Sequence, residues 1–274
     1  MRLPLHHPRP RRRLLGLVTA LAAAALVLTT GAAPASAVSP LRLATPVMAG
    51  SQIRNASGYK CTAGAVLKYD RWTTYFNSWE GATRYVVTAA HCGDLNENVT
   101  LGSSVPGKVI WRDELHDLEL IVVSPSTERA AVCSHTSAGE YCRIVLTYHP
   151  QAVGRIITRD DNTWREQRTP LVATGEPDDR VFCVSAIRAG VACGLVRTTT
   201  PAAIAAVHPG IRAAEDRSLD VQPGDSGGPV MSRSGTLYGF VSGGGIYGGV
   251  RKIDYMPWSV FAHLQPNYVL APAG

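Results

Sequence analysis

Gly224-Asp225-Ser226-Gly227-Gly228-Pro229 is the stretch of this 274-residue sequence that decides the fold. A serine hydroxyl is a poor nucleophile until a base removes its proton. It must also stand beside backbone N–H groups that can stabilise an oxyanion. Glycines on both sides of Ser226 permit a tightly turned backbone and close approach of a substrate. An ordinary turn has a similar composition, but the complete hexapeptide favours an activated serine.

A candidate general base lies far upstream, in Thr88-Ala89-Ala90-His91-Cys92. This segment follows Tyr85-Val86-Val87, an apolar run typical of a strand. A histidine at a strand end, among small residues and beside a cysteine, is held in a fixed position. General-base catalysis needs that fixed position and a side chain that titrates near neutral pH. His91 is therefore the predicted base.

Together these two motifs resemble the chymotrypsin/trypsin family of serine proteases, and most closely its secreted bacterial branch of streptogrisin and alpha-lytic type. The resemblance covers roughly residues 47 to 265 and includes the chain order His, Asp, Ser. It implies an all-β fold of two six-stranded antiparallel β-barrels with a short C-terminal helix. It also implies an oxyanion hole formed by the backbone N–H groups of Gly224 and Ser226.

The family pattern makes Asp117 the third catalytic candidate, because it precedes the apolar run Leu118 to Val123. A carboxylate behind His91 would orient the imidazole. Glu119 departs from the pattern, since relatives have a small residue there. Asp113 and Glu114 are the alternatives to Asp117.

A second glycine-rich segment, Gly239 to Gly245, resembles the family's substrate-binding strand. By that resemblance Ser242, Gly243 and Gly244 would bind substrate backbone and form one wall of the primary specificity pocket. Asp220, six residues before Ser226, occupies the position at which trypsin-like members carry the acid that selects Arg or Lys. In bacterial relatives the same position holds a cysteine, so a preference for basic P1 residues is one hypothesis for this chain.

The N-terminal boundary of the mature enzyme follows from the same resemblance. Val47 to Ile53 resembles a mature N-terminus, which makes residues 38–46 a short pro-segment. Relatives hold the acid before the nucleophile, here Asp225, with a buried cation. The Val47 amine and an arginine are both candidates for that cation.

Short apolar or alternating runs separated by Gly, Pro, Asn and Asp predict many short strands after residue 47. We expect the first barrel at 47–130 and a linker with the second barrel at 131–274, with the active site between the barrels. A helix is predicted at Trp258–Leu264, after Pro257. Residues 201–207 fit either a helical turn or a buried strand.

Residues 1–37 read as a secretory signal peptide: a basic start, an apolar run from Leu14 to about Thr30, and Ala35-Ser36-Ala37 as a cleavage site. An uncleaved membrane anchor is the alternative reading, and the arginine triplet at 11–13 also fits twin-arginine export. The formal net charge is +6, and five arginines with no acidic residue lie in the signal, which leaves +1 for the remainder. The basic pI therefore gives no reason to expect a nucleic-acid partner.

All six cysteines lie after the signal, and an even number in an exported chain predicts three disulfides. Six cysteines allow fifteen pairings, and spacing alone favours Cys133 with Cys142 and Cys183 with Cys193. The family resemblance adds Cys61 with Cys92, beside the catalytic histidine. We expect no metal site, because the sequence lacks zinc-type Cys/His spacing.

The predicted function is a secreted, extracellular serine endopeptidase that needs no cofactor, acts on protein or peptide substrates and is a monomer. A catalytically silent binding protein on the same fold is the main alternative, since fold alone does not confer function. An α/β-fold esterase is a third reading, because Gly224 to Gly228 also fits Gly-x-Ser-x-Gly. That reading lacks a βα alternation, and only His263 follows Ser226.

Overall fold

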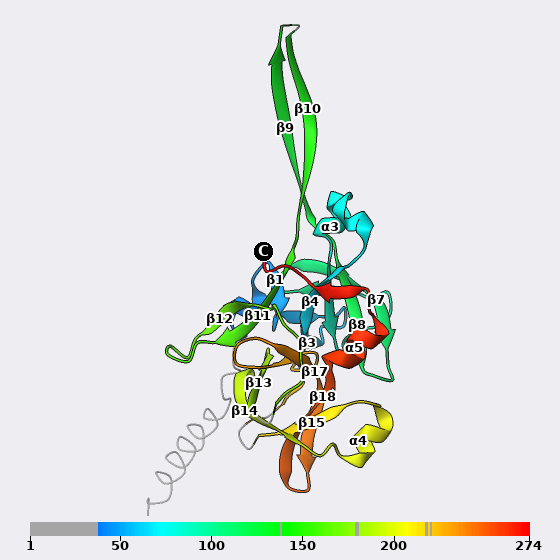
Figure 1. Ribbon diagram of the computed structural model, residues 1–274, viewed down its shortest axis with the longest axis vertical. Helices are drawn as coiled ribbons and strands as arrows, with labels where there is room; N and C mark the ends of the chain where they lie inside the picture. The colour runs from blue at the N-terminus through cyan, green and yellow to red at the C-terminus, as the bar shows by residue number, and fades with distance from the viewer. Residues whose placement is uncertain (1–37, 138, 179–180, 217–218, 220) are drawn as a thin grey trace, which may run out of the picture. The chain divides into compact units, whose positions relative to one another are not determined.

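Short antiparallel strands dominate the computed structural model, which describes residues 38–274 except 138, 179–180, 217–218 and 220 (Figure 1). Val38–Gly274 forms one packed unit. The predicted signal peptide lies outside the described residues, as does Asp220. The all-β prediction is confirmed.

The second half of the chain contains a closed six-stranded barrel with the strand order β13-β14-β15-β18-β17-β16. Its interior is filled by side chains that alternate inward along the strands, including Phe182, Val241 and Tyr255, each at most 1% exposed. The strands are β13 (Phe182–Ala186), β14 (Gly190–Thr198), β15 (Arg212–Glu215), β16 (Pro229–Met231), β17 (Leu237–Tyr247) and β18 (Val250–Pro257).

The first half forms an eight-stranded sheet with the order β19-β4-β5-β8-β7-β6-β2-β3. Its last member in the chain, β19, returns from the C-terminus to pair with β4, so a segment outside the predicted first barrel at 47–130 contributes a strand to this sheet. The strands are β2 (Gln52–Arg54), β3 (Lys60–Thr62), β4 (Ala65–Tyr69), β5 (Arg84–Thr88), β6 (Asn98–Leu101), β7 (Val105–Asp113), β8 (Leu118–Val123) and β19 (Tyr268–Leu270).

A three-stranded sheet of β1 (Val47–Ala49), β11 (Ala152–Arg159) and β12 (Glu166–Pro170) completes the packed core. The three residues of β1 are fully buried. A four-residue helix, α2 (Pro40–Leu43), precedes β1 within the predicted pro-segment.

The remaining helices are short. The predicted C-terminal helix is present with the expected bounds as α5 (Trp258–Leu264), and residues 201–207 contain a helix, α4 (Ala202–Val207). A 3₁₀ turn (Trp72–Tyr75) and α3 (Ser78–Ala82) lie between β4 and β5, and they expose Trp72, Tyr75 and Phe76. Within the described chain, no helix combines the length and apolarity that a membrane crossing requires.

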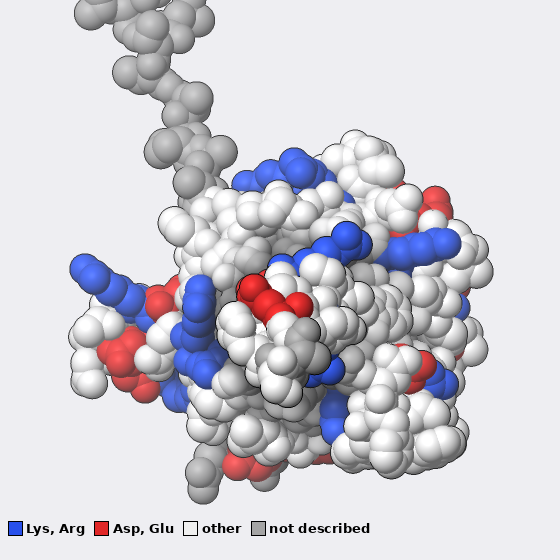
Figure 2. All heavy atoms as spheres, turned by 90° about the horizontal axis from the view of Figure 1, so that it is seen from above, with Lys and Arg blue, Asp and Glu red and all other residues white. Residues whose placement is uncertain are grey.

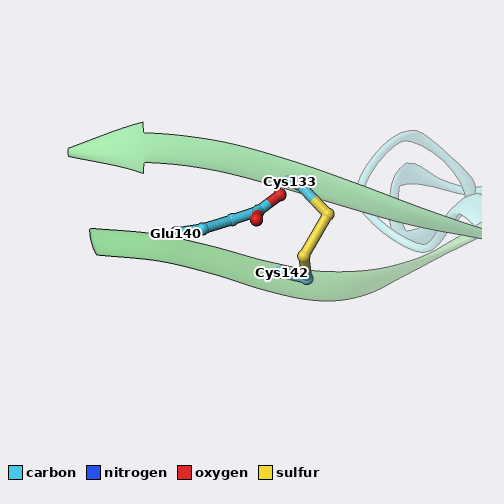
Figure 3. Close-up of side chains that lie close together, drawn as sticks. All are labelled: Cys133, Glu140 and Cys142. Carbon is cyan, nitrogen blue, oxygen red and sulfur yellow. A yellow bond between two sulfur atoms is a disulfide. The ribbon is translucent and has the colours of Figure 1, made fainter.

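A long hairpin of β9 (Ser126–Thr136) and β10 (Gly139–His149) extends away from the barrels (Figure 1). The Cys133–Cys142 disulfide links its two strands near the tip (Figure 3). Glu140 lies close to both sulfurs, but a disulfide offers no thiolate for a metal ion.

The Cys183–Cys193 disulfide joins paired residues of β13 and β14, and Cys61–Cys92 is the third. All three expected disulfides are therefore present. On the face shown in Figure 2, basic and acidic side chains are interspersed.

Candidate active site

The His91 imidazole contacts a buried carboxylate that arrives from another strand. β5 ends at Thr88, and His91 follows in a short 3₁₀ turn. Its Nδ1 lies 2.9 Å from Oδ1 and 3.1 Å from Oδ2 of Asp117, and its backbone N–H donates to the same Oδ1 at 3.2 Å. Because Nδ1–H donates to a carboxylate, Nε2 is the nitrogen left to accept a proton.

Asp117 owes its position to an unusual backbone. It has a φ of 49°, in the left-handed region that Asp tolerates better than most residues. This turn joins β7 to β8 and leaves Asp117 only 6% exposed, whereas the His91 side chain is 42% exposed. The acid is thus enclosed and the imidazole faces solvent, as an orienting acid and a proton-transferring base require.

The two alternative acids have other partners. Asp113 accepts from the backbone N–H groups of Leu115 and His116, and its Oδ2 lies 3.0 Å from the His116 ring. Glu114 is exposed and accepts from Arg112 at 2.6 Å. Neither contacts His91 in the described structure, so the geometry favours Asp117.

Ser242, expected only on the substrate-binding strand, has a further contact. Its hydroxyl donates a short hydrogen bond to Oδ2 of Asp117. This bond leaves Oδ1 for His91 and restricts rotation of the carboxylate. Sequence reasoning missed it because the partners are 125 residues apart and no local pattern signals the contact.

The Ser226 loop is clamped against the strands that position His91. The Thr62 N–H donates to the Ser226 carbonyl at 2.8 Å, and the Thr62 hydroxyl donates to the Gly224 carbonyl at 2.8 Å. Thr62 ends β3, which the Cys61–Cys92 disulfide ties to the histidine segment.

Gly227 is required at its position in this loop. It has a φ of +80°, and a Cβ there would lie 1.8 Å from Oγ1 of Thr88 and 2.4 Å from the Thr62 carbonyl oxygen. The close approach of two backbones therefore excludes any side chain. Ser226 itself is 7% exposed. The described residues contain no hydrogen bond between its hydroxyl and His91; such bonds often tighten only when substrate binds.

Two backbone N–H groups in the loop are free to bind an anion. Within the described residues, neither the Gly224 nor the Ser226 N–H donates to a protein acceptor, whereas the intervening Asp225 N–H donates to the Gln222 carbonyl. The two predicted oxyanion donors therefore lie on either side of Asp225, whose own N–H is already hydrogen-bonded. Two unpaired N–H groups close together are what an oxyanion hole needs.

Asp225 anchors this loop. It is fully buried, and its carboxylate accepts from the N–H groups of Arg188, Ala189 and Gln222 at 2.8–3.0 Å. These bonds connect the Ser226 loop to the turn between β13 and β14, which fixes the backbone on both sides.

Arg42, from α2, is the buried cation that best fits the expected partner of Asp225. It is 1% exposed, and burial lowers its pKa, while attraction to Glu166 and, more weakly, to Asp225 favours its charged form. Its guanidinium donates to Glu166, to the Gly50 carbonyl at 2.8 Å and to the Ser185 hydroxyl at 3.2 Å. The other candidate, the Val47 amine, exists only after cleavage before Val47; here Val47 has a peptide N–H, which donates to the Gln151 carbonyl at 2.9 Å.

Glu119 is accommodated as a neutral acid. It is fully buried on β8, and neither carboxylate oxygen has a hydrogen-bond partner among the described residues. Burial raises the pKa of Glu119 to about 9; Arg112 and the nearby Gly93 backbone N–H, which is not within hydrogen-bond geometry, oppose this rise, and Asp117 and Glu97 add to it. The departure from the family pattern therefore puts an uncharged carboxyl beneath the histidine segment at neutral pH.

β17 offers an unpaired edge beside the Ser226 loop. β16 pairs with β17 only as far as Phe240, and Val241 then exchanges backbone hydrogen bonds with Gly227 and Gly228. Among the described residues, Gly243 to Tyr247 pair with β18 alone. A Cβ at Gly243 would meet nothing within 4 Å. An extended peptide can add to such an edge.

A pocket of about 340 Å³ adjoins this edge. It is lined by Ala90, His91, Arg112, Glu114, Asp117, His208 and Ser242.

Comparison with known proteins supports the fold. No protein-family model and no curated protein matches the chain. Among solved structures, it is similar to Thermobifida fusca Protease A (18% identity, TM-score 0.55, 83% of this chain and 98% of that one). Nocardiopsis Protease (17%, 0.54, 82% and 98%) and Cellulomonas bogoriensis chymotrypsin (16%, 0.50, 83% and 98%) are also similar. At these identities the likeness shows that the chain has the fold of bacterial chymotrypsin-like serine proteases.

Proposed function

We propose that the protein is a secreted serine endopeptidase with His91, Asp117 and Ser226 as its catalytic residues. One observation carries this proposal: an exposed imidazole donates through Nδ1 to a buried carboxylate, on the fold of serine proteases. A histidine that served only to fill space would not need an enclosed acid behind it and a solvent-facing ring nitrogen in front.

In the proposed reaction the Ser226 hydroxyl attacks a peptide carbonyl while Nε2 of His91 takes its proton. Asp117 orients the imidazole and stabilises the imidazolium, and the free N–H groups of Gly224 and Ser226 bind the oxyanion. His91 then protonates the leaving amine. His91 next takes a proton from a water molecule, which attacks the acyl-enzyme; the bond to Ser226 breaks, and His91 returns the proton to the Ser226 oxygen.

Substrate backbone would pair with the free edge at Ser242, Gly243 and Gly244. Glycine is required at 244 by the close approach of β17 and β18, because a Cβ there would lie 2.8 Å from the Lys252 carbonyl oxygen. A preference for basic P1 residues remains part of the proposal through Asp220, which lies outside the described residues. Three disulfides support an oxidising, extracellular location.

Hydrolysis of a mixed peptide library by the purified secreted protein tests this function. The wild type should cleave internal bonds, and Ser226→Ala should not, while circular dichroism shows that both are folded. Ser232→Ala, on the exposed loop after β16, is the matched control and should retain activity. A folded wild type that cleaves nothing would contradict the proposal, as would cleavage that survives Ser226→Ala.

A further inference from the structure

Asp254, on β18, has a buried carboxylate oxygen without a partner. The residue is 3% exposed, and its Oδ2 accepts from the Tyr247 hydroxyl at 3.0 Å. Its Oδ1 is buried and has no hydrogen-bond partner among the described residues. Burial raises the pKa of Asp254. Such a group is costly to keep, and the reaction proposed above does not use it.

The carboxylate lies on the outer face of the barrel, beside the substrate-binding edge. Asp254 pairs with Gly243 across β17 and β18, and directly paired residues of antiparallel strands project from the same face. Its neighbours Ile253 and Tyr255 point the other way, into the barrel core. Gly243 in turn follows Ser242, whose hydroxyl donates to Asp117.

Gly243 leaves open space on β17 next to the strand that carries Asp254: a Cβ at Gly243 would meet nothing within 4 Å. We name this space the gap. A peptide strand added to the edge would place the side chain of one residue on the same face, opposite Gly243. Two strand spacings, about 9.5 Å, separate such a strand from β18. Only a long side chain can cross that distance to the carboxylate, and no side chain of β17 obstructs it at Gly243.

The surroundings favour a positively charged side chain. The Tyr247 ring folds back over Gly245, with its atoms 3.5 Å from where a Cβ would be, and so offers an aromatic wall beside the gap. Lys252, the lysine on the same face of β18, directs its ammonium to the Thr198 hydroxyl and the Thr199 carbonyl. Lys252 and, more weakly, His208 both exert a favourable charge effect on Asp254, but neither donates a hydrogen bond to it in the described structure, and the His208 Nδ1 lies 3.0 Å from the Leu115 carbonyl.

We propose that Asp254, Gly243 and Tyr247 form a subsite that binds a lysine or arginine side chain of the substrate. We name it the Asp254 subsite. It rests on the proposed function in assuming that a peptide pairs with β17. It differs from the primary specificity pocket proposed for Asp220, because it would bind the side chain of the substrate residue that lies opposite Gly243.

Binding to the inactive Ser226→Ala protein tests the subsite without relying on catalysis. Fluorescent hexapeptides are compared in pairs that carry lysine or norleucine at each position in turn. We expect lysine to bind at least about tenfold more tightly at one position, the effect of one charge-assisted hydrogen bond. Asp254→Asn should reduce this ratio to within about twofold.

A second variant and a control separate local from global effects. Gly243→Val fills the gap while keeping the Asp254 carboxylate, and it should abolish the same preference. Asp161→Asn, an exposed carboxylate paired with Arg233, should preserve it. Equal binding of lysine and norleucine at every position, absence of any peptide binding, or a preference that survives Asp254→Asn would overturn the subsite. Failure of the wild type to cleave peptides that Ser226→Ala binds would instead contradict the proposed function.

Discussion

Replacing Arg42 with methionine should destabilise the protein severely. Methionine keeps most of the volume but removes the guanidinium that donates to Glu166, Gly50 and Ser185. Glu166 would remain in a partly buried position, its side chain 19% exposed, with Oε2 already lacking a partner.

Breaking a buried ion pair by removing one member costs about 3–5 kcal/mol. For a chain of this size each kcal/mol lowers Tm by roughly 2–4 °C, so we expect a fall of roughly 6–20 °C. Urea and thermal unfolding at neutral pH, monitored by circular dichroism, measure both quantities.

The double variant Arg42→Met/Glu166→Leu separates an unpaired charge from a simple loss of packing. Removing both members of a buried pair is often close to neutral, so the double variant should recover most of the lost stability. A single variant that loses less than about 1 kcal/mol, or a double variant no more stable than the single one, would refute the reasoning.

The same ion pair bears on the predicted pro-segment. Residues 38–46 contain α2, and the Ser103 N–H donates to the Leu43 carbonyl at 2.9 Å. We propose that a protein beginning at Val47 would lose Arg42 and become as unstable as Arg42→Met.

Three further predictions concern single features. Glu119→Gln should flatten the pH dependence of the free energy of unfolding. Because the pKa of Glu119 in the folded protein is raised to about 9, the wild type should lose roughly 1.4 kcal/mol of this free energy per pH unit between about pH 4.5 and about pH 9. Urea denaturation at pH 5 and pH 8 should therefore show that the free energy of unfolding falls less in the variant than in the wild type. An equal fall in both proteins would contradict this. Gly227→Ala should cost more than about 2 kcal/mol in urea unfolding, since both its φ and its contacts exclude a Cβ; a loss below about 0.5 kcal/mol would contradict this. Cys133→Ser/Cys142→Ser should speed proteolysis within 126–149 while changing global unfolding by less than about 1 kcal/mol, because the hairpin strands are mostly exposed; unchanged proteolysis would contradict it.

The sequence was sufficient to predict the features that depend on neighbouring residues. The alternating apolar runs gave the all-β class, and Pro257 at the helix start placed α5. The glycines around Ser226 and the small residues before His91 identified two segments that the structure connects through Thr62 and the Cys61–Cys92 disulfide.

The sequence was not sufficient to predict contacts between segments that lie far apart in the chain. Arg42 meets Glu166 across 124 residues, and no pattern in an irregular N-terminal segment predicts its burial. The length of the β9–β10 hairpin was not recognisable from the sequence, since its residues are exposed and lack a clear alternation. Residues 201–207 fitted either a helical turn or a buried strand, and the structure forms the helix α4, in which no residue is buried.

The rate at which a fluorophosphonate modifies Ser226 tests the central claim most directly, because that reaction requires the neighbouring base to remove the hydroxyl proton. Mass spectrometry of the labelled wild type should locate the adduct on Ser226, and His91→Ala should slow its formation by more than about a thousandfold while the protein remains folded. Labelling of Ser226 at an undiminished rate without His91, or an adduct on a different residue, would contradict the account.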